Sequence, residues 1–272
     1  MIKTRKEIAE LIVENLQKNK ESLQKQFLET KKDIGFFYLD NLLPDDLCSE
    51  IHQKFPELSE AEKKKDLREF KHIAYQMNKY DKLLEEVIYA FQEENVVRLI
   101  SGICEIKKPL PDENLYAGGL SLMAKDNYLN PHLDNSHDKD RNLWRVLNLL
   151  YYVTPNWSLE NGGNLELWPN GIKNNPLVLT SKFNRLIVMA THQHSWHSVN
   201  KVVIDRVRCC VSNYYFSKTP LLKEDKFHVT LFRARASEKG KDILLKIDNF
   251  VRSSVRKVLK KGVRENPHQY KK

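Results

Sequence analysis

The stretch RVLNLLYYVTPNWSLENGGNLELWP (residues 145–169) contains two short apolar runs, VLNLLYYVT and GNLELW, which are separated by proline, asparagine and glycine. Short apolar runs bounded by such turn residues predict β-strands. The same pattern extends from about residue 114 to residue 217, with further runs in LYAGGLSLMA, PLVLT, NRLIVMA and RVRCCVSNYYF. A series of short strands at this spacing is typical of a sandwich or a barrel.

Helices are expected on both sides of this β region. Residues 4–31 carry apolar side chains at helical spacing, and residues 58–105 are helical in character. Between them, IGFFYLDNLL (34–43) predicts a strand, and the following segment opens with the helix-entry signals Pro44 and two acids. The last 30 residues return to a helical pattern. We therefore expect an N-terminal helical and strand support region (1–112), a β core (113–217) and a C-terminal extension with a basic amphipathic helix (218–272).

The composition suits one large domain with helical additions. The 272 residues include four cysteines, too few for a disulfide scaffold, and no CxxC pair that would indicate a zinc knuckle. A reduced, cytoplasmic location is therefore expected. No apolar run reaches the ~18 residues of a membrane span. Glu7, Glu10 and Glu14 interrupt the apolar stretch that a signal peptide would need.

The positive charge is concentrated at the C-terminus. Residues 249–272 hold eight Lys or Arg and one Glu, so +7 of the net +9 lies there and the other 248 residues carry +2. No specific nucleic-acid binding is expected from so neutral a body. Two interpretations of the terminal helix stay open. It packs on the β core with its basic face in solvent, or it is drawn to an anionic partner such as a membrane surface.

Two segments of the β region concentrate metal-type ligands. NPHLDNSHD places His132 and Asp134 two residues apart, and THQHSWHSV supplies His192, His194 and His197. Residues at i and i+2 of a strand point to the same side. Two histidines and one carboxylate leave three positions open on Fe(II), which suits a chelating cosubstrate and O₂. HxD alone is a weak pattern, and ordinary turn residues are the alternative.

Arg206 and Arg208 begin the run RVRCCVSNYYF, which predicts a buried strand with both guanidinium groups on one face. A buried charge is costly unless it is paired. A guanidinium fork fits a carboxylate, so a dicarboxylic cosubstrate would satisfy it. The alternative is an internal salt bridge to Glu166 or Asp205.

Together these segments resemble the Fe(II)- and 2-oxoglutarate-dependent dioxygenases, within them the prolyl-4-hydroxylase-like branch, over roughly residues 34–217. The resemblance is carried by the ordered set HxD, YYxxxxW with a following GG, WHSV, and an arginine before an aromatic pair. It implies a mainly β core with α additions, namely a double-stranded β-helix (jelly roll) with supporting helices and a C-terminal helix.

The resemblance also implies site residues. The iron ligands would be His132, Asp134 and His197, whereas His192 and His194 do not match a ligand position. The distal carboxylate of 2-oxoglutarate would bind Arg208, with Arg206 as the alternative. Tyr152 matches a tyrosine that contacts the same carboxylate in relatives, and Asn148 lies on the same face of that strand. Four residues near the proposed site are candidates for contacting substrate, with ordinary packing or a polar turn as their alternative role: Asn135, His137, Arg145 and Trp157. Leu122 departs from the pattern, because some relatives carry a cosubstrate tyrosine there.

The activity implied is hydroxylation of an unactivated C–H bond, in which O₂ is consumed, 2-oxoglutarate becomes succinate and CO₂, and ascorbate is stimulatory. We favour a small or anionic biosynthetic substrate because of the long helical additions and the basic tail. A prolyl hydroxylase acting on a protein or peptide is the alternative. A non-catalytic, cupin-like metal-binding protein is a second alternative, and it would not require Arg208 together with Tyr152.

Overall fold

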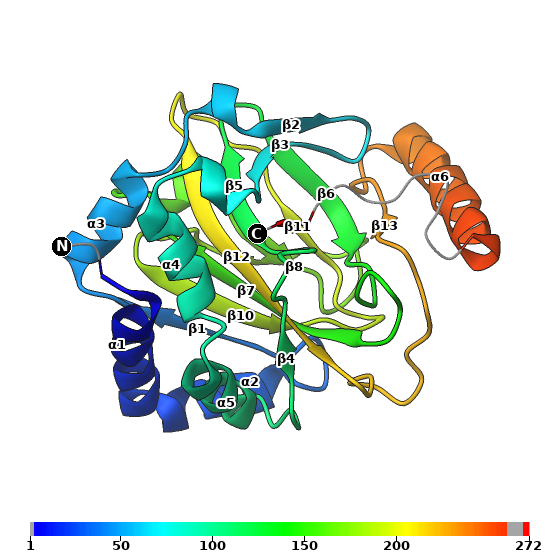
Figure 1. Cartoon of the computed structure of the whole chain (residues 1–272). Coiled ribbons are helices and arrows are strands. Elements are labelled where there is room, and N and C mark those ends of the chain that lie inside the picture. Colours follow the sequence, from blue (N-terminus) through cyan, green and yellow to red (C-terminus); the bar gives the residue numbers. More distant parts are fainter. Residues whose placement is uncertain (1–2, 260–268, 272) are drawn as a thin grey trace.

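A single curled sheet of thirteen strands forms the body of the protein (Figure 1), in a computed structural model that describes residues 3–259 and 269–271. The strands are β1 (Phe36–Asp40), β2 (Glu62–Lys65), β3 (Glu69–Ala74), β4 (Leu110–Pro111), β5 (Gly119–Met123), β6 (Tyr128–Leu133), β7 (Trp144–Tyr152), β8 (Leu165–Leu167), β9 (Leu177–Leu179), β10 (Arg185–Ala190), β11 (His197–Val199), β12 (Arg208–Ser217) and β13 (Leu231–Phe232).

The strand order is β1-β10-β7-β12-β5-β3-β6-β11-β8-β9, with β2 on β3, β4 on β12 and β13 on β6. The ladders are antiparallel throughout. Neighbours in this order are far apart in sequence, as in a jelly roll. The expected fold class, a mainly β jelly roll with supporting helices and a C-terminal helix, is confirmed.

Five helices gather on one side of the sheet, and a sixth lies on the opposite side beyond β13 (Figure 1). They are α1 (Arg5–Lys18), α2 (Lys20–Thr30), α3 (Asp45–Gln53), α4 (Lys82–Ala90), α5 (Glu94–Ile103) and α6 (Lys239–Val258). A capping box between Thr4 and Glu7 starts α1. The single helix expected over residues 4–31 is interrupted at Asn19, whose backbone N–H caps the end of α1.

The helices and the sheet face beneath them enclose the main apolar core. Ile8, Ile12 and Leu16 of α1 are fully buried there, together with Tyr151 of β7 and Tyr215 of β12. This packing fixes β7 and β12 from outside, so their other faces are left to line the interior of the curl. The proposed division of the chain at residues 112 and 217 stays a prediction, although β1 to β4 pair into the same sheet as the rest.

Residues 62–74 were expected to be helical, and this expectation is wrong. They form a hairpin in which Glu62 lies opposite Ile73 and Lys65 opposite Phe70. At its turn, Asp66 Oδ1 accepts hydrogen bonds from the backbone N–H groups of Arg68 and Glu69. Lys and Glu favour helices, but β3 also pairs with β5 and β6. That pairing outweighs the local helical preference.

The C-terminal helix α6 packs differently from the expectation of a docked apolar face. Leu245 is its only buried residue, whereas Leu244, Ile247 and Val251 are each more than half exposed. Polar contacts hold the helix instead. Asn249 exchanges hydrogen bonds with the backbone of Phe232, and other contacts join Asp242 to Arg233 and Arg252 to the carbonyl of Thr230. The basic residues Lys260, Lys261, Arg264 and Lys272 lie outside the described residues.

Within the described part of the chain, no helix combines the length and the apolar character that crossing a membrane requires.

Candidate active site

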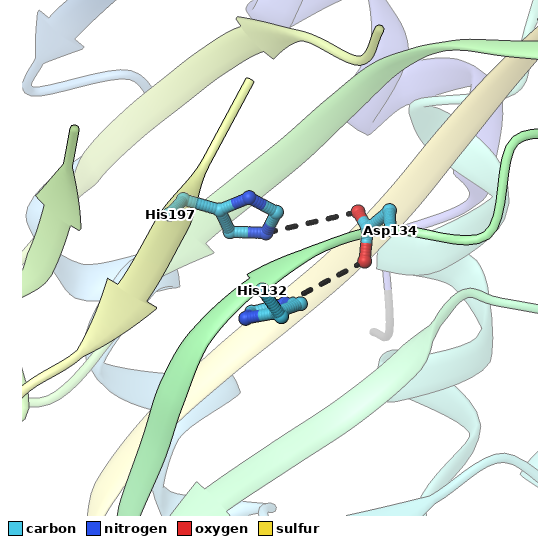
Figure 2. A group of neighbouring side chains, drawn as sticks. All are labelled: His132, Asp134 and His197. Carbon is cyan, nitrogen blue, oxygen red and sulfur yellow. Dashed lines mark ion pairs between the residues drawn. The ribbon is translucent and has the colours of Figure 1, made fainter. Parts of the chain in front are cut away.

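Three side chains converge inside the curl of the sheet. His132 lies on β6, Asp134 directly follows that strand, and His197 begins β11. Because β11 pairs antiparallel with β6, His197 stands opposite His132, with ring centroids 4.0 Å apart. Nε2 of His132 lies 3.6 Å from Oδ1 of Asp134, and Nε2 of His197 lies 3.7 Å from Oδ2 (Figure 2). One ligand atom from each residue lies within 4.8 Å of the others.

The backbone orients both imidazoles. Nδ1 of His132 lies 2.9 Å from the carbonyl of Asn130, and Nδ1 of His197 lies 2.9 Å from the carbonyl of Ser195. A carbonyl oxygen only accepts, so each Nδ1 carries the proton and each Nε2 keeps its lone pair. Figure 2 shows both Nε2 edges directed toward Asp134. This is the arrangement that a divalent metal requires of histidine ligands.

The protonation states also suit a metal. Burial, together with the neighbouring His197, lowers the pKa of His132 to about 3, so its ring is neutral near pH 7. Burial alone would raise the pKa of Asp134, but attraction to His197 and Arg145 holds that pKa below its usual value. Neutral imidazole and ionised carboxylate are the ligating forms. Nη1 of Arg145 lies 3.6 Å from Oδ1 of Asp134, and its guanidinium also stacks over the Tyr214 ring.

The three residues open into a cavity of about 930 Å³, which is within the size range of small-molecule sites. Its wall contains several buried polar atoms that have no hydrogen-bond partner among the described residues. They are Nε of Arg208, the hydroxyl of Tyr152, Oδ1 of Asn148 and Nε of Arg145. Unsatisfied polar groups in a buried wall are costly unless a ligand or water pairs with them. The cavity is therefore built to hold a polar ligand beside the three converging side chains.

Arg208 is the buried cation of this wall. Its guanidinium donates to the carbonyl of Gly163 and to Oγ of Ser121, and lies 5.2 Å from the centre of the Tyr152 ring. Among the described residues it has no carboxylate partner. Glu166 instead pairs with Arg235 at 2.6 Å, so the alternative of an internal salt bridge to Glu166 is not formed.

Arg206 does not share this environment. The strand β12 begins at Arg208, and Arg206 lies exposed in the preceding loop. Its guanidinium donates to the carbonyls of Pro155 and Asn156 on the surface. The expectation that Arg206 and Arg208 occupy one face of a buried strand is therefore wrong, because the ladder with β5 starts only at Arg208.

The side chains expected near the substrate are divided between three places. Asn135 and Arg145 line the cavity. His137 stacks on Phe227 in a separate hollow of about 330 Å³. Trp157 is buried with Met123, Val199 and Val202, and it does not belong to the cavity wall.

The side chains of β5 alternate between the cavity and the main core. Ser121 and Met123 line the cavity, whereas Leu122 between them is buried in the main apolar core. The departure from the family pattern at Leu122 therefore lies on the face turned away from the site.

Residues 118–216 match the family model described as the 2OG-Fe(II) oxygenase superfamily. This core belongs to that superfamily. The resemblance inferred from the sequence is thus confirmed, and the chain is an oxygenase whose superfamily implies Fe(II), 2-oxoglutarate and O₂. No curated protein matches the chain in sequence.

Solved structures similar to the oxygenase include prolyl hydroxylases. The prolyl-4-hydroxylase of Pseudomonas putida is 15% identical, with a TM-score of 0.53 over 72% of this chain and 98% of that chain. The prolyl hydroxylase of Trichoplax adhaerens, solved with a peptide of hypoxia-inducible factor, is 21% identical, with a TM-score of 0.53 over 75% and 92%. The fold of the prolyl-4-hydroxylase-like branch is therefore present.

A small-molecule oxygenase has a similar fold. HygX from Streptomyces hygroscopicus, solved with nickel, 2-oxoglutarate and hygromycin B, is 10% identical, with a TM-score of 0.51 over 75% of this chain and 90% of that chain. Peptide and small-molecule ligands thus both occur on this fold, so the fold alone does not identify the class of substrate.

The sequence interpretation missed one group of cavity residues. The hairpin of β2 and β3 contributes Lys63, Lys64, Lys65, Arg68 and Lys71 to the cavity wall, and α6 contributes Arg252. The sequence interpretation missed the hairpin because it assigned residues 62–74 to a helix. The alternation of Phe70 and His72 with Lys71 and Ile73 is the signal that could have revealed a strand.

Proposed function

We propose that His132, Asp134 and His197 hold Fe(II), and that the oxygenase hydroxylates a small or anionic biosynthetic substrate. The bound iron and 2-oxoglutarate supply the oxidising power, with O₂ consumed and succinate and CO₂ released. The observation that carries the proposal concerns Arg208, which is buried and has no carboxylate partner within residues 3–259 and 269–271. It lines the same cavity as the two imidazoles and the carboxylate of the triad.

The donor set fits the metal. Both imidazoles present a lone pair, both are held by backbone carbonyls, and the carboxylate is kept ionised by Arg145. Three protein ligands leave further coordination positions open on the metal, as a cosubstrate and O₂ require. Asn148 contacts the triad directly, because its Nδ2 lies 3.5 Å from Oδ2 of Asp134.

The second half of the cavity wall fits 2-oxoglutarate. Arg208 would bind the distal carboxylate, and the Tyr152 hydroxyl would donate to it, since both groups are buried and carry unsatisfied donor atoms. Burial raises the pKa of Tyr152, so its hydroxyl keeps the proton that it would donate. Asn148 is buried in the same wall beside Asp134, and its side-chain amide would hydrogen-bond the cosubstrate. A metal-binding cupin without oxidation chemistry would not need these groups.

The preference for a small, anionic substrate rests on the charge of the wall. Eight Lys or Arg and three Asp or Glu line the cavity. Such a wall attracts anions and raises their local concentration. Peptide hydroxylation remains the alternative, and stimulation of turnover by proline peptides but by no anionic metabolite would refute the preference.

Succinate formation tests the class. The purified chain would be incubated with Fe(II) and 2-oxoglutarate in air, with and without ascorbate, beside His132→Ala. We expect succinate that depends on iron and on His132, and we propose that ascorbate increases it. A second readout is anaerobic binding of 2-oxoglutarate to the nickel-loaded chain. Absence of both succinate and binding would favour the cupin-like alternative.

We also propose that α6 contacts an anionic surface. Its exposed apolar face, formed by Ile243, Leu244, Ile247, Phe250 and Val251, lies opposite the docked face, and Phe250 is 74% exposed. Apolar residues beside lysines are typical of helices that lie in a membrane interface. The sequence charge of residues 249–272 adds to this attraction.

Vesicle sedimentation tests this contact. The wild-type chain should bind vesicles of phosphatidylcholine with phosphatidylglycerol and should not bind vesicles of phosphatidylcholine alone. The double variant Ile247→Glu with Phe250→Glu should lose binding, whereas Leu28→Glu on exposed α2 should keep it. Equal binding of all three proteins would refute the contact.

A cytoplasmic location stays a prediction, supported by four buried, free cysteines.

A further inference from the structure

The hairpin of β2 and β3 presents two lysines to the cavity side by side. Lys64 lies directly opposite Lys71 in the ladder. Directly opposed residues of an antiparallel pair point to the same face of the sheet. Glu69, Lys71 and Ile73 line the cavity, whereas Phe70 and His72 do not, so the face that bears Lys64 and Lys71 is the one turned to the cavity.

Two opposed cations are unfavourable unless other charges balance them. Each lysine has one carboxylate partner on its own strand. Nζ of Lys71 lies 2.9 Å from Oε2 of Glu69, and Lys64 pairs with Glu62. An ammonium group has three donors, so one carboxylate leaves donors available on each lysine. An oxyanion placed between the two groups would relieve their mutual repulsion.

The pair lies close to the metal-type residues. Lys64 and Lys71 line the same cavity as His132 and Asp134. Lys71 is also largely shielded, with 23% of its side chain exposed. An anionic group bound by Lys71 would therefore lie in the same cavity as the triad without occupying the metal position.

The other cations of the cavity wall already have defined contacts. Arg208 is assigned to the cosubstrate in the proposed function. Arg145 lies against Asp134, Arg68 pairs with Asp66, and Arg252 pairs with Asp248 at 2.8 Å. Lys64 and Lys71 also have carboxylate partners, but they stand directly opposite each other, so a single anion can be shared between them.

We propose that Lys64 and Lys71 form a subsite for a phosphate or sulfate group of the substrate. This inference rests on the proposed function, because it assigns the substrate class of the same cavity. The lysines would bind the phosphate or sulfate group of the substrate. The carbon to be hydroxylated belongs to the same substrate molecule and would face the triad.

The hairpin contains two further lysines whose replacement is a control for the proposed subsite. Lys63 and Lys65 belong to the same strand as Lys64, and their ammonium groups lie 5.4 Å and 4.7 Å from the centre of the Phe70 ring. Lys63 and Lys65 also border the cavity, but they stand opposite His72 and Phe70, which do not, so in the ladder they belong to the face opposite that of Lys64 and Lys71. Removing these two charges changes the net charge and the charge of the cavity wall by the same amount, while the Lys64–Lys71 pair is left in place.

The test is calorimetric titration of inorganic phosphate into the full chain carrying nickel and 2-oxoglutarate. We expect Lys64→Met with Lys71→Met to weaken phosphate binding at least ~10-fold, as loss of charged hydrogen bonds does. Lys63→Met with Lys65→Met should change it by less than ~3-fold, as expected for charges that do not contact the anion and are screened by salt. Unchanged binding in the first pair, or equal loss in both, would overturn the subsite.

Two further measurements separate the subsite from the metal and from the proposed function. His132→Ala without nickel should still bind phosphate, and loss there would mean that the metal itself bound the anion, which overturns the subsite. Binding of 2-oxoglutarate is titrated independently. Phosphate binding without 2-oxoglutarate binding would refute the proposed function alone. Binding of 2-oxoglutarate without phosphate binding by the wild-type chain would refute the subsite alone.

Discussion

His197 stands directly opposite His132 in the ladder of β11 and β6, and their imidazole centroids are 4.0 Å apart. One strand pairing thus brings together two histidines that are distant in sequence. Asp134 completes the group because the chain continues from β6 past the same point. Backbone carbonyls bond Nδ1 of both rings, so the protein itself orients both imidazoles toward Asp134.

Nickel, as a redox-stable substitute for iron, should stabilise the wild-type chain against heat. At a concentration of about 100 times Kd, the gain is about 2.7 kcal/mol, which corresponds to several degrees in Tm. We expect His197→Ala to lose this shift in a thermal melt. His192→Ala should keep it, since that ring bonds the carbonyl of Ile34 instead. A shift of equal size in His197→Ala would argue against the ligand set.

Replacing Arg208 by methionine should raise the KM for 2-oxoglutarate ~30-fold or more, because two charge-assisted hydrogen bonds would be lost. Arg206→Met is the matched control, since Arg206 is exposed and its guanidinium contacts the carbonyls of Pro155 and Asn156 and the ring of Trp157. It should change KM by less than ~2-fold, as surface substitutions do. Steady-state succinate kinetics give both values, and the reverse order would reassign the cosubstrate arginine.

Gly163 positions Arg208. Its carbonyl accepts from that guanidinium, and a Cβ at this glycine would lie 2.9 Å from Cγ2 of Val202 and 3.3 Å from Cδ of Arg208. Gly163→Ala should therefore raise the KM for 2-oxoglutarate. Gly171→Ala carries the same kind of positive-φ strain, but its Cβ meets nothing within 4 Å. It should lower stability without changing KM, so comparing KM and Tm separates displacement of Arg208 from strain.

Glu86 ties α4 to the start of α1, and its contribution should depend on pH. Hydrogen bonds from Arg5 lower the pKa of Glu86 to about 2, against 4.5 for the free side chain. A lowered pKa stabilises the folded state fully above pH 4.5, and this stabilisation is lost as the pH falls toward 2. Glu86→Gln should cost about 1–2 kcal/mol at pH 7 and less at pH 3.

Urea unfolding at pH 7 and pH 3 measures this dependence. Glu29→Gln is the control, because Glu29 makes only an exposed pair with Lys25 at 3.9 Å. Its cost should stay below ~0.5 kcal/mol at both values of pH. A cost for Glu86→Gln that is the same at pH 3 as at pH 7 would mean that packing, and not the charge, sets its contribution.

Local sequence was sufficient for the strands of the core and for His132 and Asp134, whereas His197 was selected through the resemblance to the family. Short apolar runs between Gly, Asn and Pro gave β7, β10 and β12 without reference to the rest of the chain. His132 and Asp134 are two residues apart on and after one strand, so their common side follows from strand geometry alone. The ordered motifs then pointed to the oxygenase superfamily, which the family model bears out over residues 118–216.

Pairing across long sequence distances decided the rest. Residues 62–74 carry a helical composition but become strands because β3 finds partners in β5 and β6. The place where β12 starts separates Arg208 in the cavity from Arg206 on the surface. The face of α6 that docks is polar because Asn249 and Asp242 meet backbone and side-chain partners near β13. In each case the burial of a residue depends on the side chains of a segment that is distant in sequence. Local sequence patterns do not identify which segments pack together.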